Sequence, residues 1–458
     1  MRTRKLPGRP LSALLERAAA IGLRDFAYLS DRFGGAPVLL TDPEEVSRVE
    51  LSGRDGDLDA VRDLLRALDG ASTGLPVDDE GPLGLAVFLV GYEACSVLDP
   101  LAPRHPRDPA LGPDALLRVY RAGVRLLASG PEAFFPDGGP PDGLARLLDD
   151  DPGSGAASLD ERRAPRLALQ PGERQRHEER VRCCLEHLSA GVLYQANLAH
   201  RLRVEERDLA SAARFFGARL REREPPFAAF FDDARFQAAG GGSLISLSPE
   251  CFLSWDLGAR RAAAFPIKGT RPRGSTPEED RALKRELLAS EKDEAEHVMI
   301  VDLLRNDLGK VARPGGVTVE ELMRVVSVPN VHHLESVIAA ELDEGVRLSQ
   351  LLEATVPGGS ITGAPKSAAL DVIHELEGGA RGPYTGVLGA VDGRGRGASS
   401  ILIRTWIRPD GAAGALHVGG GVVVGSEPEA ELQETLDKAR AFGRVTGPIE
   451  TSTHAPRR

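Results

Sequence analysis

The amino-acid sequence predicts an α+β fold, and three observations support this class. Strand-like and helix-like patterns occur along the whole chain, no strand–turn–helix unit recurs as it does in a doubly wound sheet, and there are no internal repeats. Strand meanders covered by helices are the expected arrangement for such a mixture. The 458 residues are too many for one ordinary core, and length alone suggests roughly two to four domains.

Composition and charge limit the compartment and the partners. The hydrophobic content of 41% and the charged content of 27% are typical of a soluble globular protein. The net charge of -11 argues against a nucleic-acid or anionic-membrane partner, because either would require a basic face. The four cysteines are too few for a disulfide framework and lack zinc-site spacing, and no apolar signal core follows the basic N-terminus. We therefore expect a cytoplasmic protein with no nucleic-acid or membrane partner.

Residues 1 to 128 alternate between helix and strand patterns. The predicted helices are Leu11–Ala20 and Leu58–Leu68, and the predicted strands are Pro37–Leu40, Leu85–Val90 and Leu116–Ala128. Residues 129–166 are rich in Pro, Gly and Asp, which predicts a linker with one short helix at Leu144–Leu148. We therefore divide the chain into an N-terminal domain of residues 1–150 and a second domain of residues 167–458.

The patterns become clearer after residue 170. The predicted helices are Glu173–Leu188 and Leu209–Arg221, and the predicted strands are Leu193–Leu202, Phe227–Phe231 and Ser243–Ser248. Ser290 is suited to cap a helix that runs through Leu308, and the apolar residues of this helix cover more than one stripe, which predicts burial on two sides. Ser426–Glu429 has the sequence of a capping box, and it predicts a last helix that Gly443 closes.

The stretch Phe265–Thr270 is the one around which the other candidates gather. Its alternation predicts the end of a strand, with the two apolar side chains on one face and Lys268 on the other. Gly269 allows a sharp bend or the close approach of a ligand. A single lysine in such a place is ordinarily a solvated charge, so a role for Lys268 depends on its neighbours.

Glu296 and Glu434 lie on the two late helices. Each has an ordinary explanation, because Glu296 suits a solvated face and Glu434 forms an i,i+4 pair with Lys438. Alternatively, two carboxylates on facing helices hold Mg²⁺, which prefers few protein oxygens and keeps sites for water and an anionic ligand. Spacing alone leaves both interpretations open.

Residues 357–367 form a glycine-rich turn that opens a helix and superficially resembles a P-loop. Ala364 and Pro365 separate Gly363 from Lys366, and proline has no N–H to offer a phosphate. We therefore do not expect nucleotide binding, although the amides of this turn remain able to bind a carboxylate.

Gly419–Gly421 and Arg404 complete the candidate site residues. The glycines either let a ligand approach the backbone closely or form a β-bulge. Arg404 is a charge within an apolar stretch that predicts a strand at residues 401–405. A buried arginine must be paired, and an anionic substrate is a natural partner.

Together these stretches resemble the chorismate-utilising enzymes, the family of anthranilate, aminodeoxychorismate, isochorismate and salicylate synthases. The matches cover about residues 170 to 445 in the right order, whereas the N-terminal third resembles the family's variable N-terminal domain only loosely. Many ordered matches are specific even where single ones are weak. The matching stretches are Ser248–Glu250, Pro266–Arg271, Glu296–Leu308, His333–Leu334, Gly358–Lys366, Ile403–Thr405, Gly419–Gly421 and Gln433–Thr435.

The resemblance implies two facing antiparallel β-sheets with helices on the outside. It implies that Glu296 and Glu434 hold Mg²⁺ against the ring carboxylate of chorismate, and that Glu250 is the general acid for the departing C4 hydroxyl. Arg404 and Tyr384 would hold the enolpyruvyl carboxylate. The full set of implied substrate-binding residues is Thr270, His333, Ser360, Tyr384, Arg404, Gly420, Gly421, Gln195 and Lys438.

Two positions distinguish the reactions of the family. Gln195 stands where isochorismate- and salicylate-forming members carry a lysine base for water, and an amide cannot replace that base. Lys268 stands where anthranilate synthases usually carry alanine and aminodeoxychorismate synthases carry lysine. The resemblance therefore implies that Lys268 attacks C2 of chorismate and that ammonia then attacks C4, giving 4-amino-4-deoxychorismate for 4-aminobenzoate and folate biosynthesis. We expect a strongly lowered pKa for Lys268, because only a neutral amine attacks.

No glutamine-hydrolysing segment is recognisable around the four cysteines. The resemblance implies that a separate glutamine amidotransferase subunit supplies ammonia. The polar residues 450–458 do not resemble a lyase, so we expect conversion to 4-aminobenzoate to require another protein. Three alternatives remain: an anthranilate synthase, a non-enzymatic binding protein that keeps the fold, and a nucleotide hydrolase, which the interrupted glycine-rich turn disfavours.

Overall fold

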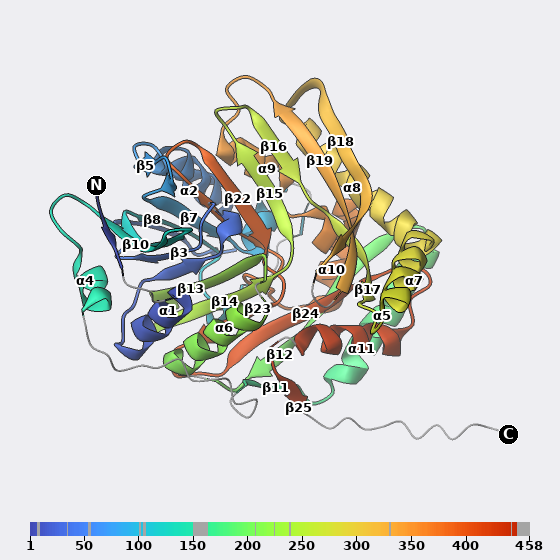
Figure 1. Ribbon diagram of the computed structural model, residues 1–458. Coiled ribbons are helices and arrows are strands. Elements are labelled where there is room, and N and C mark those ends of the chain that lie inside the picture. The colour runs from blue at the N-terminus through green and yellow to red at the C-terminus, as the bar shows by residue number, and fades with distance from the viewer. Residues whose placement is uncertain are drawn as a thin grey trace.

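Two large β-sheets face each other between outer helices in the computed structural model of the protein (Figure 1). The structure describes residues 1–6, 10–33, 35–53, 56–99, 102–103, 107–149, 164–206, 208–223, 225–237, 240–328, 331–440 and 442–446. The polar tail at residues 450–458 lies outside these ranges. Within them, neighbouring strands pair antiparallel except for the parallel pair β11–β25. The predicted α+β class is therefore confirmed.

The strand order of each sheet is as follows. The first sheet runs β1 (Arg2–Lys5), β10 (Gly130–Phe135), β9 (Ala122–Leu127), β3 (Val38–Thr41), β2 (Ala27–Leu29), β13 (Phe227–Gln237), β14 (Gly240–Ser248), β23 (Thr405–Pro409), β24 (Gly414–Val422), β12 (Gln195–Val204), β11 (Arg166–Leu169) and β25 (Arg444–Thr446), with β20 (Gly363–Ala364) also paired to β12. The second sheet runs β17 (Ile267–Pro272), β19 (Val331–Leu342), β16 (Arg261–Ala264), β15 (Cys251–Asp256), β22 (Arg396–Ile401), β21 (Val387–Val391), β7 (Leu85–Val90), β8 (Ala115–Tyr120) and β4 (Glu45–Val49), with β18 (Ala312–Ser327) also paired to β19. A small hairpin joins β5 (Val77–Asp78) and β6 (Gly81–Pro82).

The helices cover the outer faces of the sheets. They are α1 (Leu11–Ala20), α2 (Asp57–Ala71), α3 (Tyr92–Val97), α4 (Asp142–Leu148), α5 (Glu173–Ser189), α6 (Leu209–Arg223), α7 (Pro277–Leu288), α8 (Glu291–Gly309), α9 (Leu348–Thr355), α10 (Lys366–Glu377) and α11 (Pro428–Ala439), with short 3₁₀ turns η1 (Asp31–Phe33), η2 (Pro109–Leu111) and η4 (Gly359–Ile361). No helix within the described ranges is long and apolar enough to cross a membrane.

Strands from both predicted domains belong to the same two sheets. In the first sheet β2 of the N-terminal segment pairs with β13, and in the second sheet β7 pairs with β21. The two segments therefore share their hydrophobic cores, and the division into residues 1–150 and 167–458 stays a prediction.

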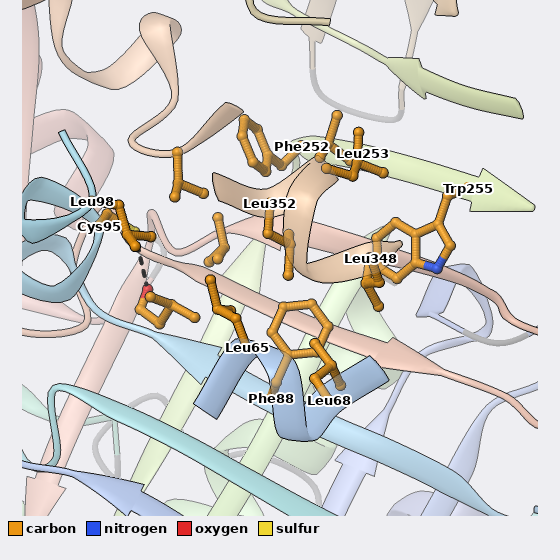
Figure 2. Close-up of a cluster of buried hydrophobic side chains, with 14 of the residues drawn as sticks. Leu65, Leu68, Phe88, Cys95, Leu98, Phe252, Leu253, Trp255, Leu348 and Leu352 are labelled. Atoms are coloured by element: carbon orange, nitrogen blue, oxygen red, sulfur yellow. Dashed lines mark hydrogen bonds between the residues drawn. The ribbon is translucent and has the colours of Figure 1, made fainter. Parts of the chain in front are cut away.

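Strand β7 contributes side chains to two hydrophobic cores, one on each face of its sheet. Its six residues are all buried, with Leu85, Val87 and Leu89 in the core between the sheets and the alternate residues in the core beneath the helices. Figure 2 shows Phe88 of this strand among side chains of α2, α3, α9 and β15. A continuous apolar run is typical of a strand buried on both faces.

Four expectations for the strands and the linker are wrong. Phe265–Thr270 is not the end of a strand, because β16 ends at Ala264 and β17 runs from Ile267 to Pro272. The stretch 116–128 is not one strand but two, β8 and β9, which belong to different sheets. The predicted linker contains the strand β10 as well as α4, and its residues 150–163 lie outside the described part. Arg404 does not lie within a strand, because it stands between β22 and β23 with a φ of 49°.

The sequence predictions for α8 and α11 are only partly confirmed. Ser290 caps α8 as predicted, since its hydroxyl accepts a hydrogen bond from the backbone N–H of Asp293. Burial of α8 on two sides is wrong at Val298, which is 39% exposed. The capping box of α11 is also wrong, because the Ser426 hydroxyl bonds the Glu431 carboxylate and the helix ends at Ala439, before Gly443.

Candidate active site

Lys268 lies on β17 at the edge of the second sheet, where the strand is irregular. Lys268 is opposite Leu334 and Thr270 is opposite His333, so Gly269 is an extra residue in the ladder. Gly269 has a φ of 81°, and a Cβ there would lie 3.1 Å from Leu287 and 3.3 Å from Asp293. Glycine is therefore required at this bulge, which bends the strand beside α7 and α8 and sets the direction of Lys268.

The amine of Lys268 stands among the predicted carboxylates. Burial lowers the pKa of Lys268, while the charges of Glu296, Glu250 and Glu434 oppose this and the charge of Lys438 adds to it. The predicted lowering of the Lys268 pKa is confirmed in direction. A larger fraction of the amine is consequently neutral at a given pH than for a lysine in water.

Glu250 follows β14 and is 7% exposed. The hydroxyl of Ser360 donates a hydrogen bond to its carboxylate over 2.9 Å. Burial raises the pKa of Glu250 to about 7, against the opposing effects of Ser360, Lys268 and Arg404. A carboxyl group that is half protonated near neutral pH is suited to general acid catalysis.

The charges of Glu296 on α8 and Glu434 on α11 both act on the Lys268 amine. Burial raises the pKa of Glu296, whereas for Glu434 the charge and hydrogen bond of Lys438 outweigh burial and lower the pKa. Both carboxylates fit Mg²⁺, which is bound through one or two carboxylates and keeps several waters. The described residues contain no group of three or more His, Cys, Asp or Glu side chains able to hold a metal, so the Mg²⁺ site remains a prediction.

Different side chains lie against successive glycines of β24. The pairing of β24 with β12 has no bulge, which leaves close approach as the explanation for Gly419–Gly421. A Cβ at Gly421 would contact the amide nitrogen of Gln195 and lie 3.5 Å from the Lys268 Nζ. A Cβ at Gly420 would instead lie 3.9 Å from a Glu434 oxygen.

His333 and Thr270 form a pair at the edge of the site. The Thr270 hydroxyl and the His333 Nδ1 are 2.8 Å apart, although Thr270 is exposed while His333 is buried. Burial lowers the pKa of His333 to about 4, and the charge of Arg404 adds to the effect. His333 is therefore neutral at neutral pH, and Arg404 lies close enough to influence it from the turn between β22 and β23.

Lys438 and Tyr384 complete the predicted set. The Lys438 amine donates to the Gly419 carbonyl over 2.9 Å and lies 2.7 Å from Glu434. Tyr384 is 3% exposed, and its hydroxyl would lie 2.7 Å from a Cβ at Gly419. Electrostatic interactions thus link Lys268 with Glu250, Glu296, Glu434 and Lys438, while the roles of all the predicted site residues remain predictions.

Sequence reasoning missed a buried support behind Tyr384. The Arg381 guanidinium lies over the Tyr384 ring at 5.7 Å and donates to the Asn197 carbonyl and the Glu377 carboxylate at 2.7 and 2.6 Å. Glu93, from the N-terminal segment, accepts hydrogen bonds from the backbone N–H of Arg381 at 2.7 Å and of Gly382 at 2.9 Å. The N-terminal segment thereby holds the loop that carries Tyr384.

Lys366 of the glycine-rich turn is used in a buried ion pair. Its amine lies 2.6 Å from the carboxylate of Asp307 on α8, which Lys310 also contacts at 2.8 Å. Asp307 is 1% exposed. The pair joins the start of α10 to the helix that carries Glu296, which accounts for this lysine without a nucleotide.

Lys366→Met is expected to lower the free energy of unfolding by about 3 kcal/mol. This value is at the low end for a broken buried pair, because Lys310 remains bound to Asp307. Urea denaturation measures the change. Lys284→Met is the control, since Lys284 lies 3.7 Å from Asp280 in a partly exposed i,i+4 pair worth less than about 1 kcal/mol. Equal losses in the two variants would contradict the role of the Lys366–Asp307 pair.

Comparison with known proteins agrees with this geometry. The sequence profile of the chorismate binding enzymes matches residues 25–444, so the chain belongs to the chorismate binding enzyme family. Over 269 residues it is 41% identical to an anthranilate synthase component 1 of Haloarcula marismortui, which covers 59% of this chain and 53% of that protein. Over 273 residues it is 41% identical to aminodeoxychorismate synthase component 1 of Salmonella typhimurium, which covers 59% and 57%. The matched segment thus spans little more than half the length of these relatives.

Solved structures of the family share the fold. Anthranilate synthase component I from Streptococcus pneumoniae superposes with a TM-score of 0.72 at 25% identity, covering 89% of this chain and 92% of that one. The menaquinone-specific isochorismate synthase of Escherichia coli superposes with a TM-score of 0.68 at 17% identity, covering 97% and 94%. The two facing sheets are therefore the fold of the family, and the particular reaction remains to be argued from the site.

Proposed function

We propose that this protein aminates chorismate at C4 and forms 4-amino-4-deoxychorismate. The observation that carries the proposal is the Lys268 amine, with its lowered pKa, beside the buried acid Glu250. A water-activating base is absent from position 195, because Gln195 cannot accept a proton. These two features favour a covalent lysine route over direct attack by water.

The proposed reaction has two balanced steps. In the first, the neutral Lys268 Nζ forms a bond to C2, the two ring double bonds shift, and the C4–O bond breaks as Glu250 supplies the proton that makes water the leaving group. In the second, ammonia forms a bond to C4, the two double bonds shift back, and the C2–Nζ bond breaks, with its electron pair returning to Lys268 and a proton leaving the new amine. Covalent catalysis divides one difficult displacement into two and directs nitrogen to C4.

Mg²⁺ is the proposed cofactor, with Glu296 and Glu434 as the residues that would hold it. The ion would neutralise the ring carboxylate of chorismate. Arg404 and Tyr384 would orient the enolpyruvyl carboxylate, and Ser360 would position the acid Glu250. A glutamine amidotransferase subunit is the proposed partner that supplies ammonia, and the proposed pathway is 4-aminobenzoate and folate biosynthesis.

Product analysis tests this function. Purified protein, chorismate, Mg²⁺ and ammonium are expected to give a product that retains the enolpyruvyl group, identified by mass and by its conversion to 4-aminobenzoate with a lyase. The alternative is anthranilate formation through attack at C2, because the chain is equally similar to an anthranilate synthase component 1 and to an aminodeoxychorismate synthase component 1. Anthranilate as the product would overturn the proposed C4 reaction.

The pH dependence of the first step is expected to differ between wild type and Glu250→Gln. Glu250 must be protonated to donate, and burial raises its pKa to about 7, so its acid form is lost as the pH rises through that value. The neutral fraction of Lys268 rises with pH over the same range, so above about pH 7 the wild-type rate is expected to rise less steeply than the neutral fraction of the amine. Adduct formation in the absence of ammonia is measured against pH, because ammonia itself then does not titrate in the assay. Glu250→Gln is expected to lower the rate by about 10²-fold and to leave only the rise that Lys268 causes. The same pH profile in both proteins would show that Glu250 is not the acid.

A further inference from the structure

The buried carboxamides of Gln195 and Asn197 take no part in the two proposed reaction steps. Gln195 is 1% exposed and Asn197 is 9% exposed. Among the residues that the structure describes, neither amide oxygen has a hydrogen-bond partner. A buried polar group without a partner loses the hydrogen bonds it makes in water, so two such groups side by side call for a ligand.

Both carboxamides lie on the same face of β12. Alternation along the strand places Ala196 and Leu198 on the other face, in the core under α5 and α10. Gln195 and Asn197 therefore point toward the space between the sheets, where Lys268 also lies.

The two carboxamides lie against glycines of the neighbouring strand β24. A Cβ at Gly419 would lie 2.9 Å from the Asn197 amide oxygen and 2.7 Å from the Tyr384 hydroxyl. A Cβ at Gly421 would contact the Gln195 amide and lie 3.5 Å from the Lys268 amine. The two carboxamides thus form a row between the Lys268 amine and the Tyr384 hydroxyl, over a strand that leaves room for them.

We infer that Gln195 and Asn197 form the ammonia-binding site of this enzyme, an inference that rests on the proposed amination. Ammonia offers three N–H donors, and two amide oxygens accept two of them while the nitrogen lone pair remains free to attack. The carboxamides are uncharged, so they bind a neutral amine without the protonation that a carboxylate would promote. A protonated ligand would have no lone pair with which to react.

Steady-state kinetics with ammonium as the nitrogen source test the site. The variants are Asn197→Leu and Gln195→Met, which keep a similar side-chain shape and remove the hydrogen-bonding groups. Each is expected to raise the KM for ammonia about tenfold, and Asn197→Leu is expected to change the KM for chorismate less than twofold. Gln175→Met is the matched control, because Gln175 lies exposed on α5, and it is expected to leave both constants unchanged.

A second measurement keeps the inference separate from the proposed function. Adduct formation with chorismate alone, measured by intact mass, is expected to match wild type in a folded Asn197→Leu variant. A tenfold rise in the KM for chorismate in Asn197→Leu, or an unchanged KM for ammonia in both variants, would overturn the ammonia site while the wild-type product still stands. Failure of the wild-type protein to aminate chorismate at all would overturn the proposed function, and the ammonia site with it.

Discussion

Lys268→Ala is expected to lower amination of chorismate at C4 by roughly 10²-fold or more. The variant removes the only group in the proposed mechanism that forms a bond to C2, so ammonia would have to displace the C4 hydroxyl directly. Binding should survive, because the other groups proposed to hold the carboxylates, Arg404 and Tyr384, are unchanged. Product formation under saturating chorismate and ammonium measures the loss.

The covalent role of Lys268 is also tested by trapping its adduct with chorismate. Wild-type protein mixed with chorismate and Mg²⁺ but no ammonia is expected to gain the mass of chorismate less one water, and Lys268→Ala is expected to gain nothing. Lys284→Ala is the control, because Lys284 lies on α7 in a partly exposed ion pair with Asp280 and should behave as wild type. If Lys268→Ala forms as much C4 product as wild type, the lysine is not a covalent catalyst.

Local signals in the sequence were sufficient for many of the elements. The helix α1 and the strand β7 have the bounds that their apolar patterns predict, and the cap at Ser290 forms as expected. These features depend on neighbours within a few residues, so a sequence pattern carries the information that is needed.

Elements that depend on distant contacts could not be read in this way. The hydroxyl of Ser426 bonds the Glu431 side chain, and a capping motif cannot reveal that competing partner. Likewise, β8 and β9 are adjacent in the sequence but belong to different sheets, because each pairs with strands more than 20 residues away.

The candidate site shows the same limit. The ordered motifs identified Lys268, Glu250, Glu296 and Glu434 as candidates. In the structure the charges of the three glutamates act on the Lys268 amine. The hydrogen bonds of Glu93 to the loop at Arg381 span 288 residues, and no local pattern predicts them. Asn197 could have been found, because it is two residues from Gln195 and alternation places both on one face of β12.

Glu296→Gln is expected to lower C4 amination by about 10²-fold or more and to raise the Mg²⁺ concentration needed for half-maximal activity. Glutamine keeps the size of the side chain but removes one of the two charges proposed to hold the ion, and Mg²⁺ is bound through few carboxylates. Initial rates over a Mg²⁺ titration measure the change, and chelation of the metal should abolish activity in wild type. Glu294→Gln, an exposed position two residues away on α8, is the control.

The direction of the change in activity distinguishes a metal ligand from a residue that acts only through its charge on Lys268. The charge of Glu296 raises the pKa of Lys268, so its removal lowers that pKa further and increases the neutral, attacking fraction of the amine. If Glu296 acted only through this charge, Glu296→Gln would be as active as wild type or more active near neutral pH. A loss of activity that excess Mg²⁺ partly restores is instead the result expected of a weakened metal site. Glu434→Gln should give the same pattern, and the double variant should lose little more than either single one, because both carboxylates are proposed to hold the same ion.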